Sequence, residues 1–445
     1  MRKGPEAAAA RHLPCRAPCR APVLRPRSCT SARALHPLRR TGSGPVPLLP
    51  CPGCLRILPT AADFSCAAPQ PRLTSAFMTT NARLTALAAA LPSTVPFTGP
   101  EELERRRGAP FAARLGANEN GFGPSPRALV AMTGSASGIW QYGDPASHEL
   151  RAALADHWGC EVANIVVGGG IDGLLCDLVR LTVAPGDVIV TSAGAYPTFN
   201  YHVAGFGGRI ETVPYRDDAE DLPALIARAA EVDAKLVYFA NPDNPMGSYL
   251  PGAAIAEALA ALPAGTLLVL DEAYGEFAPE EAAVPLPVDD PRLVRMRTFS
   301  KGYGMAGARV GYALGPEELI RAFDKVRNHF GMNRSAQAGA LAALQDQDWL
   351  GHVRAAVAAS REAIAAIARD NGLVPLPSAT NFVTIDCGGD GDRARALVAA
   401  LAEEGIFVRM PFVAPQDRCI RISCGPEREM TLLAEALPRA LARLG

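Results

Sequence analysis

The chain has 445 residues, 49% of them hydrophobic, and its 44 Lys and Arg nearly balance its 45 Asp and Glu. This length and apolar content suffice for a large core, and we expect a globular protein of about two domains. The charge is uneven: residues 1–76 hold twelve Lys and Arg against Glu6 and Asp63, so the remainder carries a net charge of about −11. An acidic body argues against a nucleic-acid partner, whose phosphates require clustered cations.

Residues 1–77 differ in composition from the rest of the chain. They contain 13 of the 39 prolines and six of the eleven cysteines, with no sustained helical or strand period, and we expect a disordered extension. The segment could be an Arg-rich organellar transit peptide, or the protein could start at Met78, where an amphipathic segment begins. We favour the start at Met78. A third interpretation, the weakest because no strand or helix supports it, is a zinc site formed by four cysteines: Cys15, Cys19, Cys51 and Cys54.

The remaining cysteines are scattered through apolar segments: Cys160, Cys176, Cys387, Cys419 and Cys424. We expect them to be small buried thiols in a reducing cytoplasm. No apolar run in the body reaches the roughly 20 residues needed to cross a bilayer. The sequence therefore predicts a cytoplasmic protein without a membrane partner and without a metal.

From Asn164 onward, short β-branched runs alternate with Ala/Leu-rich stretches of helical period. The runs apolar enough to be strands buried on both faces are Ile165–Gly168, Val188–Ser192, Lys235–Ala240, Thr266–Asp271 and Val294–Phe299. This alternation predicts an α/β fold with a mostly parallel sheet and helices on both faces. Ligands of such sheets bind beyond the carboxyl ends of the strands.

The pattern changes near residue 377. A strand over Ala379–Asp386 is followed by a helix, a strand pair over Ile406–Arg409 and Cys419–Ser423, and a final helix. This succession predicts a smaller α+β domain. We therefore divide the body into an N-terminal arm with part of the small domain, a large ligand-binding domain and a small C-terminal domain: residues 78–135, 136–375 and 376–445.

A glycine cluster lies between a predicted strand and a predicted helix. Gly168, Gly170 and Gly173 match G-x-G-x-x-G, which would suggest a nicotinamide enzyme. Such a site also needs an acidic residue about 20 positions later, and the chain has Gly194–Tyr196 there instead. Small residues at a helix start still let backbone N–H groups approach a phosphate. We expect the phosphate-binding amides to be those of Gly170, Ile171 and Asp172.

Lys301 follows Asp271 by thirty residues, and Asp271 closes an apolar run. A lysine can hold an aldehyde cofactor as a Schiff base, and the conjugated ring then accepts electrons that no side chain could delocalise. Such a ring needs a carboxylate for its pyridinium nitrogen and cations or hydroxyls for its phosphate. Asp271 can supply the first, and Arg309, Thr298 and Ser300 the second. The pattern predicts a pyridoxal 5'-phosphate (PLP) site.

From about Leu115 to the C-terminus, the chain resembles the fold-type I PLP-dependent aminotransferases of class I/II, and among them most closely the histidinol-phosphate aminotransferases. Order and spacing agree over more than 300 residues, in Ala117–Asn120, Tyr142–Pro145, Asn241–Gly247, Asp271–Tyr274, Thr298–Lys301, Ala308–Gly311 and Arg421–Ser423. The resemblance implies a mostly parallel, seven-stranded type of sheet, a PLP cofactor and a place in histidine biosynthesis.

The resemblance also implies roles for individual side chains. Lys301 would hold the cofactor and move the substrate proton, and Asp271 would pair with the ring nitrogen. Asn244 and Tyr274 would bind the ring oxygen. Phe199 would stack on the ring, with an ordinary core position as the alternative. The phosphate would be held by Gly170, Ile171, Asp172, Thr298, Ser300 and Arg309, and by Tyr142 from a second subunit of a homodimer.

Arg421 is the candidate that binds a substrate carboxylate, because two parallel N–H bonds fix the carboxylate plane. Asn381, Arg409 and Asn118 are expected in the same cavity. The chain departs from the family in two places. Met246 stands where threonine is usual, and residues 171–173 replace a Ser-Asp-Glu. These departures leave the choice of substrate open.

The expected activity is ping-pong amino transfer between a small-molecule amino donor and a 2-oxo acid. Histidinol phosphate with 2-oxoglutarate is the first expectation. The alternatives are an aromatic or other amino-acid aminotransferase, and a PLP-dependent decarboxylase that acts on a phosphorylated amino acid.

Overall fold

A computed structural model of the protein describes residues 83–92 and 97–444. These residues group into one unit, Met78–Gly445. The expectations for residues 1–77 lie outside the described residues: the extension, the transit peptide, the start at Met78 and the cysteine site. The division of the body at residues 136 and 376 stays a prediction.

Within the described residues, seven strands form the main sheet, in the order β2-β8-β7-β6-β5-β3-β4. In that order the strands are Ile165–Gly168, Gly311–Leu314, Leu293–Thr298, Leu267–Asp271, Leu236–Ala240, Val188–Ser192 and Arg209–Val213. β8 is antiparallel to both of its neighbours, and the other adjacent pairs are parallel. The predicted mostly parallel sheet of seven strands is confirmed.

The five predicted strands correspond to β2, β3, β5, β6 and β7, with ends that differ by at most one residue. β4 and β8 were not predicted. β4 is an edge strand in which Arg209 and Glu211 alternate with apolar residues, so it has no continuous apolar run. β8 has four residues, including Gly311 and Ala313, and it gives little β signal because these residue types are depleted in strands.

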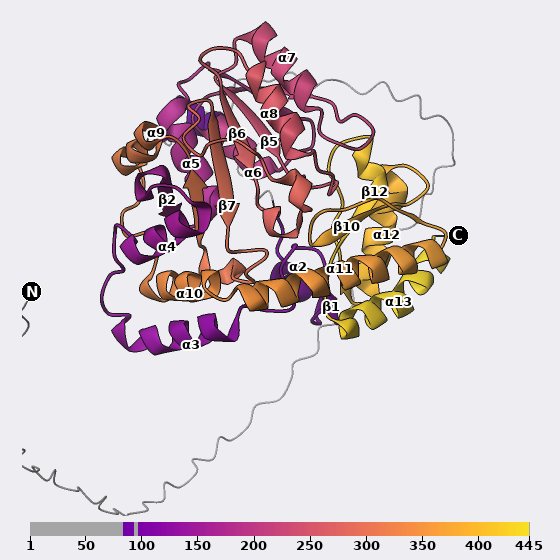
Figure 1. Ribbon diagram of the computed structural model, residues 1–445. Coiled ribbons are helices and arrows are strands. Elements are labelled where there is room, and N and C mark those ends of the chain that lie inside the picture. Colours follow the sequence, from indigo (N-terminus) through magenta and orange to yellow (C-terminus); the bar gives the residue numbers. More distant parts are fainter. Residues whose placement is uncertain (1–82, 93–96, 445) are drawn as a thin grey trace, which may run out of the picture. The chain divides into compact units, whose positions relative to one another are not determined.

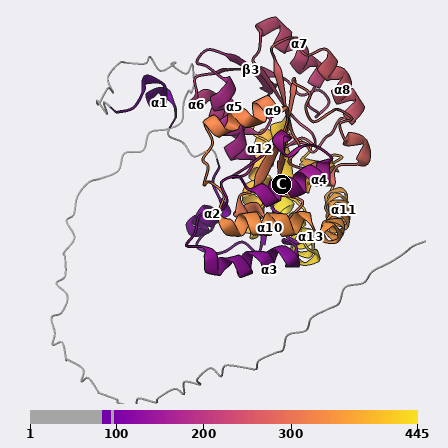
Figure 2. The same ribbon diagram turned by 60° about the vertical axis from the view of Figure 1, so that its left-hand side comes forward.

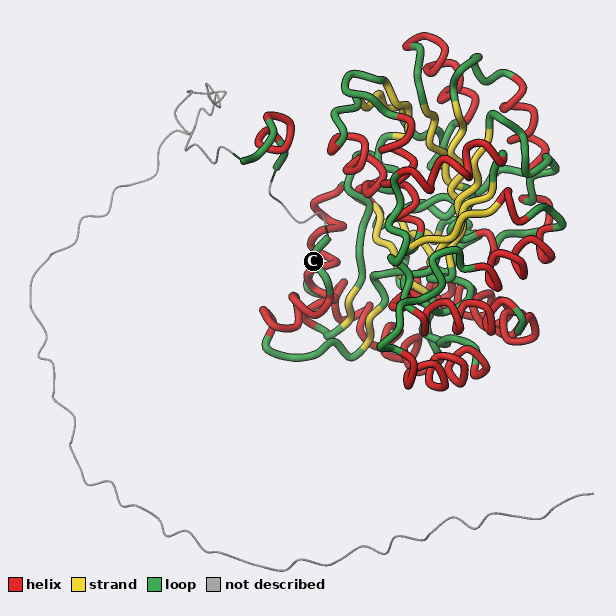
Figure 3. The backbone as a smooth tube through the Cα atoms, turned by 90° about the vertical axis from the view of Figure 1, so that its left-hand side faces the viewer, coloured by secondary structure: helices red, strands yellow, loops and turns green. Residues whose placement is uncertain are grey.

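Helices cover both faces of this sheet (Figures 1 and 3). The helices before the C-terminal part are α1 Ala86–Ala90, α2 Pro100–Arg107, α3 Pro126–Ser135, α4 His148–Trp158, α5 Ile171–Thr182, α6 Pro197–Gly205, α7 Leu222–Val232, α8 Gly252–Ala260, α9 Glu317–Ala322 and α10 Arg334–Leu344. Successive side chains of a strand point to opposite faces. In β5, Tyr238 packs with the core of α5 and α6, whereas Val237 packs with that of α7 and α8. α7 and α8 lie side by side (Figure 2).

The C-terminal part has a smaller antiparallel sheet, in the order β12-β10-β9, and the helices α11, α12 and α13. These elements are β9 Val374–Pro375, β10 Phe382–Asp386, β12 Cys419–Ser423, α11 Gln347–Asp370, α12 Gly391–Glu403 and α13 Glu427–Ala442. They share one hydrophobic core, with Phe382, Ile420 and Leu433 among its fully buried residues. The predicted smaller α+β portion is confirmed.

Two predicted C-terminal strands differ in detail. The strand expected from Ala379 begins at Phe382, because Ala379 N–H binds the Gly247 carbonyl (2.8 Å) and Thr380 Oγ1 accepts the Phe382 N–H. β11 (Ile406–Phe407) pairs in parallel with β1 (Ala113–Arg114), and it meets β12 only through a bridge beyond its end. No helix within residues 83–92 and 97–444 combines the length and the apolar character needed to span a membrane.

Candidate active site

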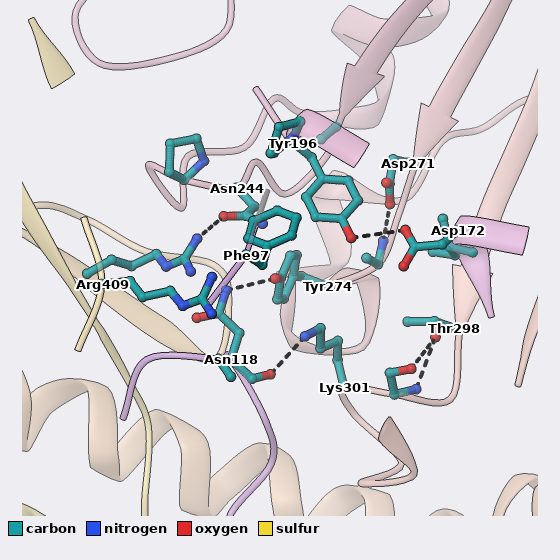
Figure 4. A pocket seen from close by; sticks show the side chains of 18 of the residues that line it. Phe97, Asn118, Asp172, Tyr196, Asn244, Asp271, Tyr274, Thr298, Lys301 and Arg409 are labelled. Carbon is teal, nitrogen blue, oxygen red and sulfur yellow. Dashed lines mark hydrogen bonds between the residues drawn. The ribbon is translucent and has the colours of Figure 1, made fainter. Parts of the chain in front are cut away.

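A cavity of about 310 Å³ lies beyond the carboxyl ends of β5, β6 and β7. Twelve of the predicted site residues line it: Asn118, Ile171, Asp172, Asn244, Asp271, Tyr274, Thr298, Ser300, Lys301, Arg309, Arg409 and Arg421. Figure 4 shows several of these side chains converging on one space. The parallel strands explain the convergence, because their carboxyl ends meet at one edge of the sheet.

Lys301 follows the end of β7 and is partly buried. Its Nζ donates a hydrogen bond to the Asn118 carbonyl at 3.0 Å (Figure 4) and lies 5.7 Å from the centre of the Tyr274 ring. Burial, and next the positive charge of Arg421, lower the pKa of Lys301 to about 8. Because its amine loses a proton far more readily than an exposed lysine, Lys301 can serve as a nucleophile or a base.

Asp271 is the last residue of β6. Its Oδ2 accepts a hydrogen bond from the Tyr238 hydroxyl (2.6 Å), and its Oδ1 accepts one from the Ala273 N–H (2.9 Å). Burial raises the pKa of Asp271 to about 6. A cation placed beside this carboxyl would favour its ionised form, so the position suits a protonated ring nitrogen.

Asn118 connects the lysine to the C-terminal sheet. It has a left-handed backbone (φ 54°), which asparagine tolerates better than most residues. Its Nδ2 donates to the Tyr274 hydroxyl (2.9 Å), its N–H donates to Ser423 Oγ (2.9 Å), and its carbonyl accepts from Lys301 Nζ. Asn118 thereby fixes the relative positions of Lys301 and Tyr274.

Asn381 does not line the cavity, so the expectation that it binds substrate is corrected. The residue is fully buried, and its Nδ2 donates to the carbonyls of Asn118 (3.0 Å) and Glu119 (3.3 Å). It immediately precedes β10, which directs its amide onto the backbone of the Asn118 segment. Asn381 therefore supports the wall of the cavity from behind.

The phosphate cradle consists of Gly170, Thr298, Ser300 and Arg309. Gly170 caps the N-terminus of α5 with φ 87°, and a Cβ at this position would lie 2.3 Å from Arg309 Nη2. Arg309 Nη1 donates to Ser300 Oγ (3.2 Å), and Thr298 Oγ1 donates to the same oxygen (2.9 Å). The free N–H groups of a helix start, a guanidinium and two hydroxyls meet here, a combination that suits a phosphate. Gly170 belongs to the cradle through its contact with Arg309, but it is not among the residues that line the cavity.

Arg409 and Arg421 are joined by an antiparallel backbone bridge. Arg421 Nη1 donates to Asn244 Oδ1, and Arg409 Nη2 donates to the Thr98 carbonyl (2.9 Å). Among the described residues, their guanidinium donors meet only oxygens of neutral groups, and Arg421 Nε has no partner. Burial lowers the pKa of Arg421 to about 10, which leaves it charged at neutral pH. Two cations facing one cavity favour an anionic ligand group.

Tyr196 also lines the cavity, and the sequence analysis gave it no role. Its hydroxyl donates to Asp172 Oδ1 (2.9 Å), and its ring lies nearly parallel to that of Phe97, with centroids 6.4 Å apart. Phe199 is fully buried and stacks on Tyr238, with centroids 4.5 Å apart. The prediction that Phe199 stacks on a cofactor ring is therefore wrong. Tyr196 caps α6 at the edge of the sheet, whereas Phe199 lies inside the helix and points into the core.

Tyr142 does not line this cavity. Its side chain is 77% exposed, and its ring lies 4.8 Å from that of Phe330. Phe97 and Phe412 do line the cavity and were not predicted. Both come from segments without regular structure, where residue spacing carries no signal. The described residues hold no group of His, Cys, Asp and Glu that could bind a metal.

Residues 113–437 match the family of class I and II aminotransferases, and the chain belongs to this family. The resemblance inferred from the motifs is thereby confirmed. The crystal structure of a histidinol-phosphate aminotransferase from Sinorhizobium meliloti, in complex with pyridoxal-5'-phosphate, is 54% identical to this chain. The match covers 83% of this chain and 100% of that one, with a TM-score of 0.80.

Two further relatives are histidinol-phosphate aminotransferases by name. The protein from Roseiflexus castenholzii is 38% identical over 355 residues, which make up 78% of this chain and 95% of the relative. Histidinol-phosphate aminotransferase 2 from Ralstonia nicotianae is 36% identical over 333 residues, or 74% of this chain and 89% of the relative.

Proposed function

We propose that the protein is a PLP-dependent aminotransferase that takes the amino group of histidinol phosphate and passes it to 2-oxoglutarate, as a step of histidine biosynthesis. The observation that carries this proposal is the meeting of Lys301, Asp271 and the phosphate cradle in one cavity. The names of the three relatives support the substrate, above all that of the Sinorhizobium meliloti protein at 54% identity.

The residues present fit the cofactor at three points. Lys301 offers an amine with a lowered pKa, Asp271 offers a buried carboxyl at the end of β6, and the cradle offers Arg309 with hydroxyls and helix amides. When bound, PLP supplies a conjugated ring that stabilises the negative charge left when the substrate loses a proton. Asp271 would sustain that effect by keeping the ring nitrogen protonated.

The side chains around Lys301 define its part in the reaction. Its amine, held by the Asn118 carbonyl, would remove the proton from the amino-bearing carbon of the substrate and deliver it to carbon 4′ of the cofactor. Asn244 and the Tyr274 hydroxyl would donate to the ring oxygen. Tyr274 can donate because burial raises its pKa to about 12, which keeps its hydroxyl protonated.

The amino donor and the 2-oxo acid each carry an anionic group. Histidinol phosphate carries a phosphate, and glutamate and 2-oxoglutarate carry carboxylates. Arg421 and Arg409 present guanidinium groups that can bind either kind of oxyanion. One cavity that accepts both substrates in turn gives ping-pong kinetics.

The walls of the cavity favour a substrate with a flat ring. Tyr196 and Phe97 lie nearly parallel along one side, and Phe412 lines the same cavity. These rings can pack against an imidazole or a phenyl group. An aromatic amino-acid aminotransferase is therefore the second candidate function.

We also propose a homodimer in which Tyr142 reaches the phosphate of the partner's cofactor. In support, Tyr142 is highly exposed, and large apolar side chains near it in sequence or space are exposed as well: Ile139, Trp140 and Phe330. Apolar groups gathered on a surface mark interaction sites. We further propose a cytoplasmic location, which accords with the free thiols of all five cysteines in the described residues.

An amino-donor panel with 2-oxoglutarate as acceptor tests the proposed function. We expect kcat/KM for histidinol phosphate to exceed that for phenylalanine by about tenfold or more, and Lys301→Ala to be inactive with both. A preference for phenylalanine would overturn the substrate but leave the enzyme class. Release of carbon dioxide without consumption of 2-oxoglutarate would indicate a decarboxylase instead.

A further inference from the structure

Two acidic side chains are buried together behind Asn244. Glu220 is 4% exposed and Asp243 is 1% exposed. Their carboxyl groups are hydrogen-bonded to one another. Two ionised carboxylates can only accept hydrogen bonds, so this bond requires that one of the pair carry a proton.

The surroundings place the proton on Glu220. Asp243 accepts hydrogen bonds from the Tyr215 hydroxyl (2.9 Å) and the Met246 N–H (3.0 Å), and the charge of Arg421 further favours its ionised form. Glu220 accepts bonds from two neutral donors, Ser192 Oγ (2.7 Å) and the Ala240 N–H (3.3 Å). Burial, and next the charge of Asp243, raise the pKa of Glu220 well above its ordinary value. The hydroxyls of Tyr215 and Tyr238 also face Glu220.

Asp243 fixes the turn that presents Asn244. Besides the side-chain bond to the Met246 N–H, its carbonyl accepts the Gly247 N–H (3.1 Å), and its own N–H donates to the Ser248 carbonyl (2.8 Å). Asn244 is the next residue in the chain, and its Oδ1 accepts from Arg421 inside the cavity. A change in Asp243 would therefore alter the position of Asn244.

The loop that carries Glu220 is itself held in place. Asp218 accepts two hydrogen bonds from Arg418, at 2.7 and 3.1 Å, and Arg418 also binds Asp386 of β10 (2.7 Å). Asp217 and Asp218 both have left-handed backbones, with φ of 51° and 61°, a conformation that persists only where the surroundings hold it. Glu220 is thus a rigid support for Asp243.

We propose that Glu220 is a positioning residue for the amino-transfer reaction: the proton it shares with Asp243 holds the turn at residues 243–247 and thereby directs Asn244 at the cofactor ring oxygen. The inference rests on the proposed function, and it assigns to the buried pair a role in orienting the ring-binding group. Glu220 itself touches neither cofactor nor substrate.

Three variants separate this role from simple structural support. Glu220→Ala removes the donor to Asp243. Glu220→Gln restores a donor, since its amide N–H takes the place of the acid proton. Asp221→Asn is the matched control, because Asp221 lies on the same loop and caps α7 through the Ala224 N–H (3.1 Å) without touching the pair.

The readout is the pH at which half of the chromophore is deprotonated, measured from the visible absorption band of the PLP-bound protein. A hydrogen bond to the ring oxygen favours the deprotonated chromophore, so its loss raises this midpoint. We expect Glu220→Ala to raise it by about one pH unit, equivalent to about a tenfold change in the equilibrium. Glu220→Gln and Asp221→Asn should stay at the wild-type value. A midpoint that is unmoved in Glu220→Ala, or moved equally in all three variants, would overturn the proposal.

A second measurement needs no cofactor and covers the case in which Glu220→Ala does not fold. The infrared difference spectrum of cofactor-free wild type minus Glu220→Gln at pH 7 should show a protonated carboxyl band. Its absence would mean that the pair holds no proton, and the proposal would fail. Neither measurement uses an amino substrate. A protein that passes both but transfers no amino group from histidinol phosphate would contradict the proposed function alone.

Discussion

At the scale of single residues, the site depends on the free amine of Lys301. Because its pKa is lowered to about 8, the rate at which cofactor-free protein gains the visible band of PLP should rise about tenfold per pH unit below that value and level off above it. Stopped-flow absorbance measures this rate. Lys301→Arg, which keeps a cation at the position, should gain no such band. A rate that still rises steeply between pH 8 and 10 would show that the amine titrates like an exposed lysine.

Asp271 should make the cofactor-free protein less stable as the pH rises. Its pKa is about 6 in the folded protein, above the roughly 3.9 of an unfolded chain. The folded state therefore holds the proton more tightly, and the stabilisation present below about pH 4 is lost as the pH rises through 6. When the pH rises from 4 to 7, the unfolding free energy of wild type should fall by about 2–3 kcal/mol more than that of Asp271→Asn.

Urea unfolding of the cofactor-free proteins at the two pH values tests this expectation. The pH dependence contributed by Asp243 is common to both proteins and cancels in the comparison. Equal losses in wild type and Asp271→Asn would contradict the burial argument. The variant should also bind PLP more weakly, because it cannot offset the charge of the ring nitrogen.

Arg421→Lys should damage both half-reactions. Lysine keeps the charge but cannot form two parallel bonds to an oxyanion, and we expect kcat/KM to fall by about 10- to 100-fold for histidinol phosphate and for 2-oxoglutarate. Arg443→Lys, a change in an exposed ion pair, is the control. A loss confined to one substrate would mean that the two anionic groups bind at different places.

The residues that sequence predicts best are those whose chemistry is tied to a strand end. Asp271 and Lys301 could be assigned because each follows an apolar run, and a PLP site requires both residue types. Phe199 and Tyr196 are three positions apart, and only the start of α6 decides which of them faces the cavity. Asn381 was misplaced because side-chain direction before a strand cannot be inferred from residue type.

At the scale of elements, the conformation of the turn between β2 and α5 requires glycine at position 170. A side chain there would need a left-handed backbone and would collide with Arg309. Gly170→Ala should cost about 1–2 kcal/mol of stability and raise the Kd for PLP. Gly173→Ala is the matched control, since a Cβ there meets nothing within 4 Å, and alanine inside α5 should stabilise it by up to about 1 kcal/mol. Equal PLP affinities in the two variants would exclude Gly170 from the cradle.

The elements themselves could be predicted where both sheet faces are covered. Runs such as Leu236–Ala240 are apolar at every position, because helices lie above and below them. β4 and β8 escaped prediction because one is a half-exposed edge and the other is short and rich in small residues. Pairings are harder still to predict: β11 joins β1, some three hundred residues earlier in the chain.

At the scale of the whole molecule, the cavity combines residues from distant parts of the sequence. Asn118 precedes the main sheet, Tyr196 follows β3, and Arg421 belongs to the C-terminal sheet. The sequence around each residue does not indicate that the three lie together, because the distances between them depend on packing. This is why the sequence could identify an aminotransferase but could not rank an imidazole against a phenyl ring.

The proposed dimer can be tested by complementation. Lys301→Ala and Tyr142→Ala should each be impaired, because one lacks the amine and the other lacks the residue that reaches across. If Tyr142 acts on the partner's site, mixed dimers contain one intact site, and random mixing should restore about a quarter of wild-type activity. No recovery after exchange of subunits, confirmed by mass spectrometry, would show that Tyr142 does not act on the partner's site.

The central claim is that one cavity accepts an amino group from histidinol phosphate and then gives it up. The most direct test is to add histidinol phosphate to the PLP-bound protein without any acceptor and to follow the visible absorption. We expect the band to disappear with one equivalent of donor per site and to return when 2-oxoglutarate is added, with Lys301→Ala showing neither change. A band that histidinol phosphate leaves intact while another amino donor removes it would contradict the proposed substrate. A band that no amino donor removes would contradict amino transfer itself.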